Sequence, residues 1–344
     1  RDRWVLMSAL SLLLLVVVGA GSAILVIGYK LQQNIDFIGD PFAELPSRPP
    51  AGGVTSPGAT PAPVQVEDAM NILVVGSDSR ISAGDPTQWE AGAQRTDVIM
   101  LVHLPADGSA AYLMSVPRDS WVEIPGHGQA KINAAFSLGG TPLLIQTFEQ
   151  LTGVRIDHVA LTDFESFKAI TDALGGVEIA LREDLVNKGQ VVATAGPQIL
   201  TGDQALIYVR QRKNLARGDF DRVQRQQAWM RSIFLRMRSQ ETLLSPSRWG
   251  PVLDAVSHSV ALDDGFTRSV QEQLIRRLAG LKAEDVRFFT VPLAGTGRSA
   301  DGQSIVLLKH PQFDGLMAAV ASDTLGTYLE AHPDDVENLP RIAP

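Results

Sequence analysis

The chain begins with an uninterrupted apolar segment, Trp4 to Tyr29, in which the Tyr29 phenol is the only ionisable group. About 20 apolar residues suffice for a helix to cross the hydrocarbon core of a bilayer, so this segment predicts a transmembrane helix over residues 4–29. A cleavable signal peptide is the alternative, because the small residues at 20–23 resemble a cleavage site. The apolar run exceeds a usual signal-peptide core and continues past that point, which favours the uncleaved helix.

Charge around this helix predicts its orientation. Arg1 and Arg3 precede it, and basic flanks favour the cytoplasmic side. We therefore expect residues 1–3 to be the remnant of a cytoplasmic tail. The rest of the chain is expected on the extracytoplasmic face of the cell membrane, anchored by a single pass. The net charge of −8 argues against a nucleic-acid partner, and the lack of cysteine excludes disulfides and thiolate metal sites.

Composition divides the external part of the chain. Residues 30–66 are rich in Pro, Gly, Ala, Ser and Thr, which predicts a semi-extended extracytoplasmic tether. From Met70 onward, short apolar runs alternate with helix-like patterns. This alternation indicates an α/β fold, namely an α/β/α sandwich with a mixed central sheet covered by helices on both faces. We expect one folded domain over residues 67–330, followed by a C-terminal tail over residues 331–344.

Charged residues lie at the ends of three predicted strands. Asp78 follows the first strand, Asp97 precedes the second with Arg95 beside it, and Arg118 follows the third. Because functional loops gather at strand ends of α/β sheets, we expect these side chains to converge. Carboxylates without His or Cys suit Mg²⁺ or Mn²⁺, and arginine binds phosphate through two parallel hydrogen bonds. The pattern predicts a metal-assisted phosphate site, although Asp78 in its Gly-Ser-Asp-Ser loop also fits an Asx-turn.

A helix beginning at Asp219 would carry charge on its inner face. Asp219, Arg222 and Gln226 fall on the line that continues as Met230 and Ile233, so they are predicted to point inward. Burying a charge is costly unless it is paired or liganded, which makes this face a site candidate. The simpler alternative is an ordinary i,i+3 ion pair between Asp219 and Arg222.

Two further arginines, Arg210 and Arg212, lie two residues apart directly after Tyr208 and Val209. In an extended segment both would point the same way. Together with Arg95, Arg118 and Arg222 they would supply the cationic half of a phosphate site. Phosphoryl transfer asks a protein mainly for positioning and charge stabilisation, and this set of side chains provides both.

In order and spacing, these elements resemble the LytR-CpsA-Psr family of cell-wall glycopolymer ligases over residues 68–235. The matching elements are Asn71-Ile-Leu-Val-Val-Gly-Ser-Asp78-Ser-Arg80, Arg95-Thr-Asp97, Ser115-Val-Pro-Arg118-Asp119, Lys131-Ile-Asn133, Asp163-Phe, Gly175-Gly-Val177, Leu200-Thr-Gly202, Tyr208-Val-Arg210-Gln-Arg212 and Asp219-Phe-Asp-Arg222-Val-Gln-Arg225-Gln226. Frequent Ala, Gly and Arg are also typical of a high-GC, actinobacterial genome.

The resemblance implies a membrane-anchored phosphotransferase. Such an enzyme binds a polyprenyl pyrophosphate-linked glycan and transfers the phosphoglycan to a hydroxyl of peptidoglycan or another wall polymer. A long apolar cavity would house the prenyl chain. Two other hypotheses stay open: a polyprenyl pyrophosphate phosphatase with water as acceptor, and a non-catalytic regulator that binds wall or lipid.

The resemblance also assigns roles to residues. Asp78 and Asp97 would hold Mg²⁺ (or Mn²⁺), and the group that takes the acceptor's proton is left open, with Asp97 as a candidate. Arg118 would act in catalysis and in pyrophosphate binding. The other residues that the resemblance places around the pyrophosphate are Arg95, Lys131, Arg210, Arg212, Asp219, Arg222 and Gln226.

Overall fold

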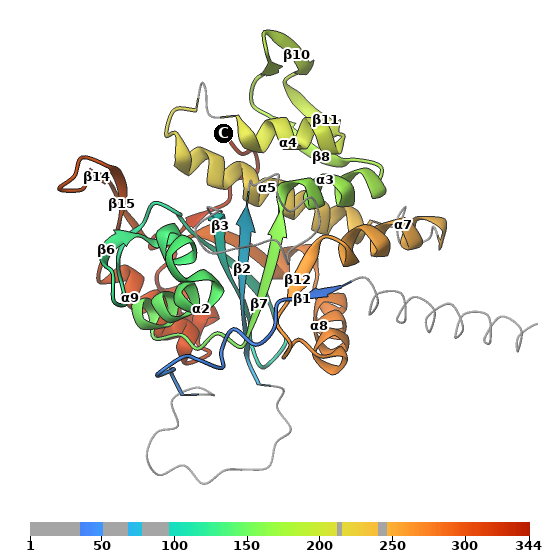
Figure 1. Ribbon diagram of the computed structural model, residues 1–344. Coiled ribbons are helices and arrows are strands. Elements are labelled where there is room, and N and C mark those ends of the chain that lie inside the picture. The colour runs from blue at the N-terminus through green and yellow to red at the C-terminus, as the bar shows by residue number, and fades with distance from the viewer. Residues whose placement is uncertain (1–34, 51–67, 78–95, 212–214, 240–245) are drawn as a thin grey trace, which may run out of the picture.

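The computed structural model describes residues 35–50, 68–77, 96–211, 215–239 and 246–344 (Figure 1). Within these ranges no helix has the length and apolar character needed to cross a bilayer. The helix predicted at residues 4–29 lies outside them, as do three of the predicted site residues: Asp78, Arg95 and Arg212.

A mixed sheet of eight strands forms the centre of the fold. In spatial order its strands are β1 (Asp36–Phe37), β12 (Val260–Leu262), β7 (His158–Asp163), β2 (Met70–Ser77), β3 (Thr96–Leu104), β4 (Ala111–Val116), β13 (Val286–Thr290) and β16 (Glu337–Asn338). Strands β2, β7, β4 and β13 run in one direction, and β3, β12, β1 and β16 run in the other. The predicted mixed α/β fold with a central mixed sheet is confirmed.

The remaining elements surround this sheet. The helices are α2 (Ile132–Thr152), α3 (Phe164–Ala173), α4 (Gly202–Arg210), α5 (Asp219–Met237), α7 (Pro246–Ser257), α8 (Arg268–Gly280), α9 (Gln312–Ala321) and α10 (Leu325–Ala331), with a short 3-10 turn at Ala283–Asp285. Four antiparallel pairs project from them: β5 (Trp121–Ile124) with β6 (Gly128–Lys131), β8 (Val177–Leu181) with β11 (Gly196–Leu200), β9 (Leu185–Asn187) with β10 (Gln190–Ala193), and β14 (Leu293–Arg298) with β15 (Ser304–Leu308).

Alternation along the central strands places apolar side chains on both faces of the sheet. In β2, Leu73 and Val75 join the core beneath α2, α9 and α10, whereas Ile72 and Val74 join the cluster that α8 covers. A third apolar cluster unites α3, α4, α5 and α7 beyond the carboxyl ends of β2 and β7, at the top of Figure 1. Helices therefore cover the carboxyl ends of these strands.

The structure describes the predicted tether, residues 30–66, only at residues 35–50. Its described part, residues 35–50, packs on the domain: β1 pairs with β12, and Arg48 bonds the buried carboxylate of Glu149 on α2. The guanidinium of Arg48 also lies 4.4 Å from the Phe42 ring centre. A composition rich in proline does not prevent a segment from packing where long-range partners are available.

The predicted C-terminal tail, residues 331–344, is likewise packed where the structure describes it. Glu337 and Asn338 form the edge strand β16. On α5, Gln224 donates to Glu337 at 2.7 Å, and Arg231 donates to the carbonyl of Arg341 at 3.1 Å. The last residues therefore brace the outer side of α5.

Candidate active site

The site lies where β2 and β4 end and β3 begins. Gly76 pairs with Val98 and Ser77 pairs with Thr96, so Asp97 is the extra residue of a β-bulge. Bulges re-aim a side chain at the edge of a sheet, often beside an active site. Asp78, which lies outside the described residues, follows Ser77 directly in the chain.

Asp97 meets Arg118, as the strand-end argument predicted. Nη1 of Arg118 forms an ion pair with Oδ1 of Asp97, and the two side chains are only 17% and 11% exposed. The buried Nε of Arg118 donates no hydrogen bond to any described residue. A buried donor without a hydrogen-bond partner is costly, and a ligand oxygen would satisfy it.

The loop after β4 also positions Lys131. Its Nζ lies 3.1 Å from Oδ1 of Asp119, next to Arg118 in the chain. The backbone N–H of Ile132 donates to the carbonyl of Ser120 at 2.8 Å, which fixes the start of α2 against this loop. Arg118 and Lys131 are therefore held on one short stretch of surface. Sequence reasoning did not identify Asp119 as the partner of Lys131.

Helix α5 begins at Asp219, as predicted, and its charged face is buried. Nη2 of Arg222 lies 2.7 Å from Oδ1 of Asp219, and the Arg222 side chain is 5% exposed. Gln226, one turn further on, is buried as well. Gly218 precedes the helix at φ 57°, a left-handed conformation that glycine adopts without steric cost. The simple i,i+3 ion pair is present, but its arginine points inward rather than into solvent.

Arg210 departs from the sequence prediction. It is the last residue of α4 rather than part of an extended segment, and its Nη1 lies 3.4 Å from Oε1 of Glu165 on α3. Glu165 was not recognised from the sequence, because it lies 45 positions away. The relative direction of Arg210 and Arg212 remains a prediction, since Arg212 is outside the described residues.

Arg225 supports this part of the site from behind. Its guanidinium lies 4.6 Å from the ring centre of Tyr208, and Nη1 donates to Oε1 of Gln211 at 3.1 Å. Burial raises the pKa of Tyr208 to about 12. Arg225 thus fixes the end of α4, where Arg210 lies, rather than contacting a ligand.

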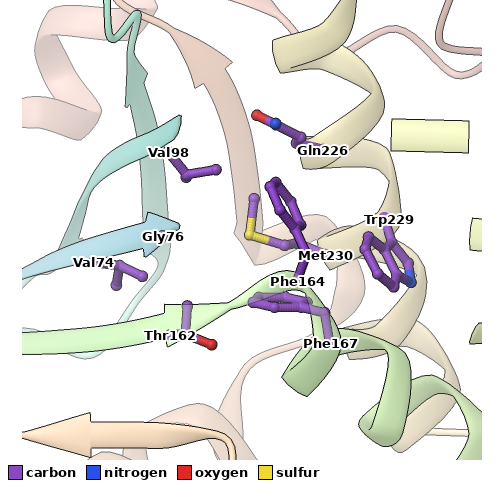
Figure 2. A pocket seen from close by; sticks show the side chains of 9 residues that line it. All are labelled: Val74, Gly76, Val98, Thr162, Phe164, Phe167, Gln226, Trp229 and Met230. Carbon is purple, nitrogen blue, oxygen red and sulfur yellow. The ribbon is translucent and has the colours of Figure 1, made fainter. Parts of the chain in front are cut away.

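An apolar pocket opens between the strand ends and α5. Figure 2 shows Val74, Gly76 and Val98 on the strand side, Gln226, Trp229 and Met230 on α5, and Phe164 and Phe167 of α3 between them. Val98 adjoins Asp97 in the chain, so the pocket begins beside the Asp97–Arg118 pair. The pocket is narrow, with a cavity volume of about 20 Å³. Its lining is apolar, as a cavity for a prenyl chain would be, but its volume is smaller than such a chain requires, so the prenyl cavity remains a prediction.

The described residues contain no cluster of three or more His, Cys, Asp or Glu side chains that could hold a metal ion. Asp97 provides one carboxylate at the strand edge, and the second predicted ligand, Asp78, is outside the described residues. The metal site therefore remains a prediction.

Comparison with known proteins identifies relatives of this chain. The LytR_cpsA_psr family profile matches residues 52–321. The cell wall biosynthesis protein LcpA of Corynebacterium glutamicum is 34% identical over 281 residues, which cover 70% of this chain and 54% of LcpA. The chain thus spans about half the length of this relative.

Relatives in Bacillus extend the comparison. The polyisoprenyl-teichoic acid–peptidoglycan teichoic acid transferase TagT of Bacillus subtilis is 30% identical over 204 residues, which cover 57% of this chain and 61% of TagT. The solved structure of TagT bound to LI-WTA superimposes with a TM-score of 0.60 and 26% identity, and covers 76% of this chain and 92% of that one. The fold is therefore shared along most of the described domain.

Proposed function

Because the chain belongs to the LytR-CpsA-Psr family, we propose that it transfers a phosphoglycan from a polyprenyl pyrophosphate-linked donor to a hydroxyl of peptidoglycan or another cell-wall polymer. The names of LcpA, a cell wall biosynthesis protein, and TagT, a polyisoprenyl-linked teichoic acid transferase, support this proposal. The related Corynebacterium protein also agrees with the expected actinobacterial source.

One observation carries the proposal: Arg118 is held by Asp97 near an apolar pocket, and its buried Nε, 3.9 Å from Oδ2 of Asp119, makes no hydrogen bond to a described residue. A guanidinium in this position suits a ligand with a phosphate group at the end of a hydrocarbon chain. Asp97 keeps the arginine charge in place before the ligand binds. The inward Arg222 at the start of α5 and Arg210 at the end of α4 supply further positive charge from the helices that cover the strand ends.

The proposed reaction is a displacement at the phosphorus that bears the glycan. The acceptor hydroxyl oxygen bonds to this phosphorus, and the bond from phosphorus to the bridging oxygen of the diphosphate breaks. Prenyl monophosphate leaves with the electron pair, and the hydroxyl proton passes to Asp97. Arg118 and Arg210 stabilise the negative charge that develops on the phosphoryl and leaving oxygens.

The proposal includes a divalent cation bound by carboxylate oxygens at this edge. Asp78 and Asp97 would hold Mg²⁺ (or Mn²⁺), and the ion would neutralise part of the diphosphate charge. The carboxylate of Asp97 is already directed into the site by the bulge of β3. No thiolate or imidazole is needed for this kind of ion.

We place the prenyl chain in the apolar pocket. A volume of about 20 Å³ is little more than one water molecule occupies, so side chains must move when a lipid enters. Met230 has three rotatable side-chain bonds and adapts to irregular ligands. Together with Phe164 it lies in the centre of the pocket and would rotate to admit the chain (Figure 2).

The apolar residues 4–29 support anchoring in the cell membrane with the site on the extracytoplasmic face. In that location both the lipid-linked donor and the wall acceptor are accessible. No nucleic acid is expected to take part, given the net charge of −8.

The test is a reaction of the full chain in detergent with a synthetic prenyl pyrophosphoryl sugar and wall fragments, followed by mass spectrometry. The proposal predicts a wall fragment that has gained the phosphosugar, together with prenyl monophosphate. Equal release of prenyl monophosphate without any wall fragment would identify a phosphatase. Lipid binding without turnover would identify a regulator. Loss of turnover in EDTA, restored by Mg²⁺, is expected if the cation acts as proposed.

A further inference from the structure

A second pocket is lined by Arg118 itself and shares no lining residue with the apolar pocket, and the reaction described above does not use it. It has a cavity volume of about 420 Å³ and is bounded by the first turns of α2, by β6 and by the β14–β15 hairpin. This volume falls within the range of about 300–1,000 Å³ that is typical of small-molecule sites. It is far larger than the apolar pocket at the strand ends.

The walls of this pocket are joined to the loop that carries Arg118. The N–H of Asn133 donates to the carbonyl of Arg118 at 3.2 Å, and the N–H of Val306 donates to the carbonyl of Asp119 at 2.9 Å. Ser120 also forms a β-bridge with Val306, which attaches the hairpin to the same loop. In Figure 1 the hairpin stands beside β6 and α2. The pocket and the catalytic arginine thus belong to one connected structure.

The lining of this pocket combines charged, neutral polar and apolar groups. Arg118, Lys131 and the Asp119 carboxylate paired with Lys131 are its charged groups, and Asn133, Ser137 and Gln303 contribute neutral hydrogen-bonding groups. Leu138 adds an apolar surface that is 49% exposed. Neutral amides and hydroxyls beside an apolar patch match a sugar ring, which presents hydroxyls at its edge and C–H groups on its face.

We infer that this pocket, lined by Asn133, Ser137, Leu138 and Gln303, is a carbohydrate-binding subsite. The inference rests on the proposed function, because it depends on the order of prenyl chain, diphosphate and sugar in the proposed donor. A diphosphate carries its prenyl chain on one phosphorus and its sugar on the other, so a donor with its prenyl chain in the apolar pocket and its diphosphate at Arg118 has its sugar free to enter the pocket that Arg118 lines. The sugar in the pocket comes either from the lipid-linked donor or from the wall acceptor, and both sources present the same chemistry.

Two variants remove groups from the pocket without touching Arg118 or Lys131. Gln303→Ala deletes an amide on an exposed hairpin, and Leu138→Ser deletes the apolar surface. Matched controls exist elsewhere on the surface. Gln198→Ala deletes an amide from another hairpin, where it donates to Thr194 at 3.1 Å, and Leu235→Ser changes a helical leucine that is 42% exposed.

Steady-state transfer by the full chain separates the two sources. Each pocket variant is expected to raise KM about two- to tenfold and to leave kcat little changed. This rise in KM corresponds to the loss of one hydrogen bond or of a comparable apolar contact. A rise in the KM of prenyl pyrophosphoryl N-acetylglucosamine assigns the pocket to the donor. A rise in the KM of a peptidoglycan disaccharide assigns it to the acceptor. Unchanged KM values for both substrates in both pocket variants overturn the inference.

Saturation-transfer NMR tests the subsite independently of turnover. The same two sugar probes are mixed with the full chain, and the signals of the sugar protons are compared between wild type, pocket variants and controls. Weaker signals for one probe in the pocket variants alone support the subsite even if no transfer is detected, in which case only the proposed reaction fails. Signals that are equal in all five proteins refute the subsite.

Discussion

Replacing Arg48 by Ala tests whether the segment before the first long strand is part of the domain. Glu149 is 2% exposed, and Arg48 is 16% exposed. Both Nε and Nη2 of Arg48 bond the Glu149 carboxylate, at 3.2 and 2.7 Å. In the variant, Glu149 would keep the N–H of Ile156 at 2.9 Å but would lose its only cationic partner among the described residues. The substitution therefore leaves a buried carboxylate only partly satisfied.

The expected cost follows from this burial. Removing one partner of a buried ion pair costs about 3–5 kcal/mol, and the remaining backbone donor together with the partial exposure of Arg48 favours a value near 3 kcal/mol. For a domain of this size, a loss of about 3 kcal/mol corresponds to a fall in Tm of roughly 6–10 °C. Loss of the contact between Arg48 and Phe42 acts in the same direction.

Thermal unfolding of the full chain in detergent, followed by circular dichroism, measures this effect. Arg268→Ala is the matched control, because Arg268 and Glu272 form a 2.8 Å pair in which both side chains are at least half exposed. Such a pair contributes about 0–1 kcal/mol, so the control should melt close to wild type. If Arg48→Ala melted no lower than Arg268→Ala, residues 35–50 would not pack as described.

Two further predictions concern the site, and a third concerns the pH dependence of the stability of the fold. Arg118→Ala should reduce kcat about 10²-fold or more in the transfer assay, because it removes charge stabilisation of the transition state. Arg118→Lys should recover only part of the lost kcat, because an ammonium lacks the planar fork of a guanidinium. Full activity of either variant would remove Arg118 from the mechanism. Gly76→Ala would place a Cβ 2.9 Å from Cβ of Val98. We therefore expect urea unfolding to show about 1–3 kcal/mol of destabilisation, and we expect prenyl pyrophosphate to bind more weakly. Unchanged binding would contradict the pocket assignment. Burial alone would raise the pKa of Asp323, but the ring of His103, with Nε2 3.1 Å from Oδ1, and the hydrogen bond from the N–H of Ala106 hold the pKa below its ordinary value. A carboxyl whose pKa is lower in the folded state stabilises the fold at a pH above its pKa in the unfolded state, and this contribution is lost as the pH falls through its pKa in the folded state. The free energy of unfolding should therefore decline below about pH 4, and the decline should be shallower in Asp323→Asn.

The sequence predicted the parts of the site that depend on local periodicity. The inward face of α5 follows from the 3.6-residue repeat that aligns Arg222 and Gln226 with Met230. The meeting of Asp97 with Arg118 follows from the placement of each at the end of a buried strand. Both are short-range patterns that survive folding because the core fixes their direction.

Features that depend on distant partners were not predicted. The pairing of Arg48 with Glu149 joins positions 101 residues apart, and nothing in the proline-rich composition around Arg48 indicates it. Arg210 illustrates a different failure: the motif indicated its chemistry, but α4 continues through it, so the extended geometry assumed for the motif was wrong. The polar pocket requires three separate segments to meet at the Arg118 loop, which no local pattern encodes.

The most direct test of the proposed transfer follows the oxygen that attacks phosphorus. The full chain is incubated in ¹⁸O-labelled water with a prenyl pyrophosphoryl sugar and a peptidoglycan fragment, and the phosphorylated products are weighed by mass spectrometry. Transfer to a wall hydroxyl predicts a phosphodiester-linked fragment without ¹⁸O, because its new bond to phosphorus uses the acceptor's own oxygen. Phosphosugar that carries ¹⁸O as the main product, whether or not the fragment is present, would contradict the account.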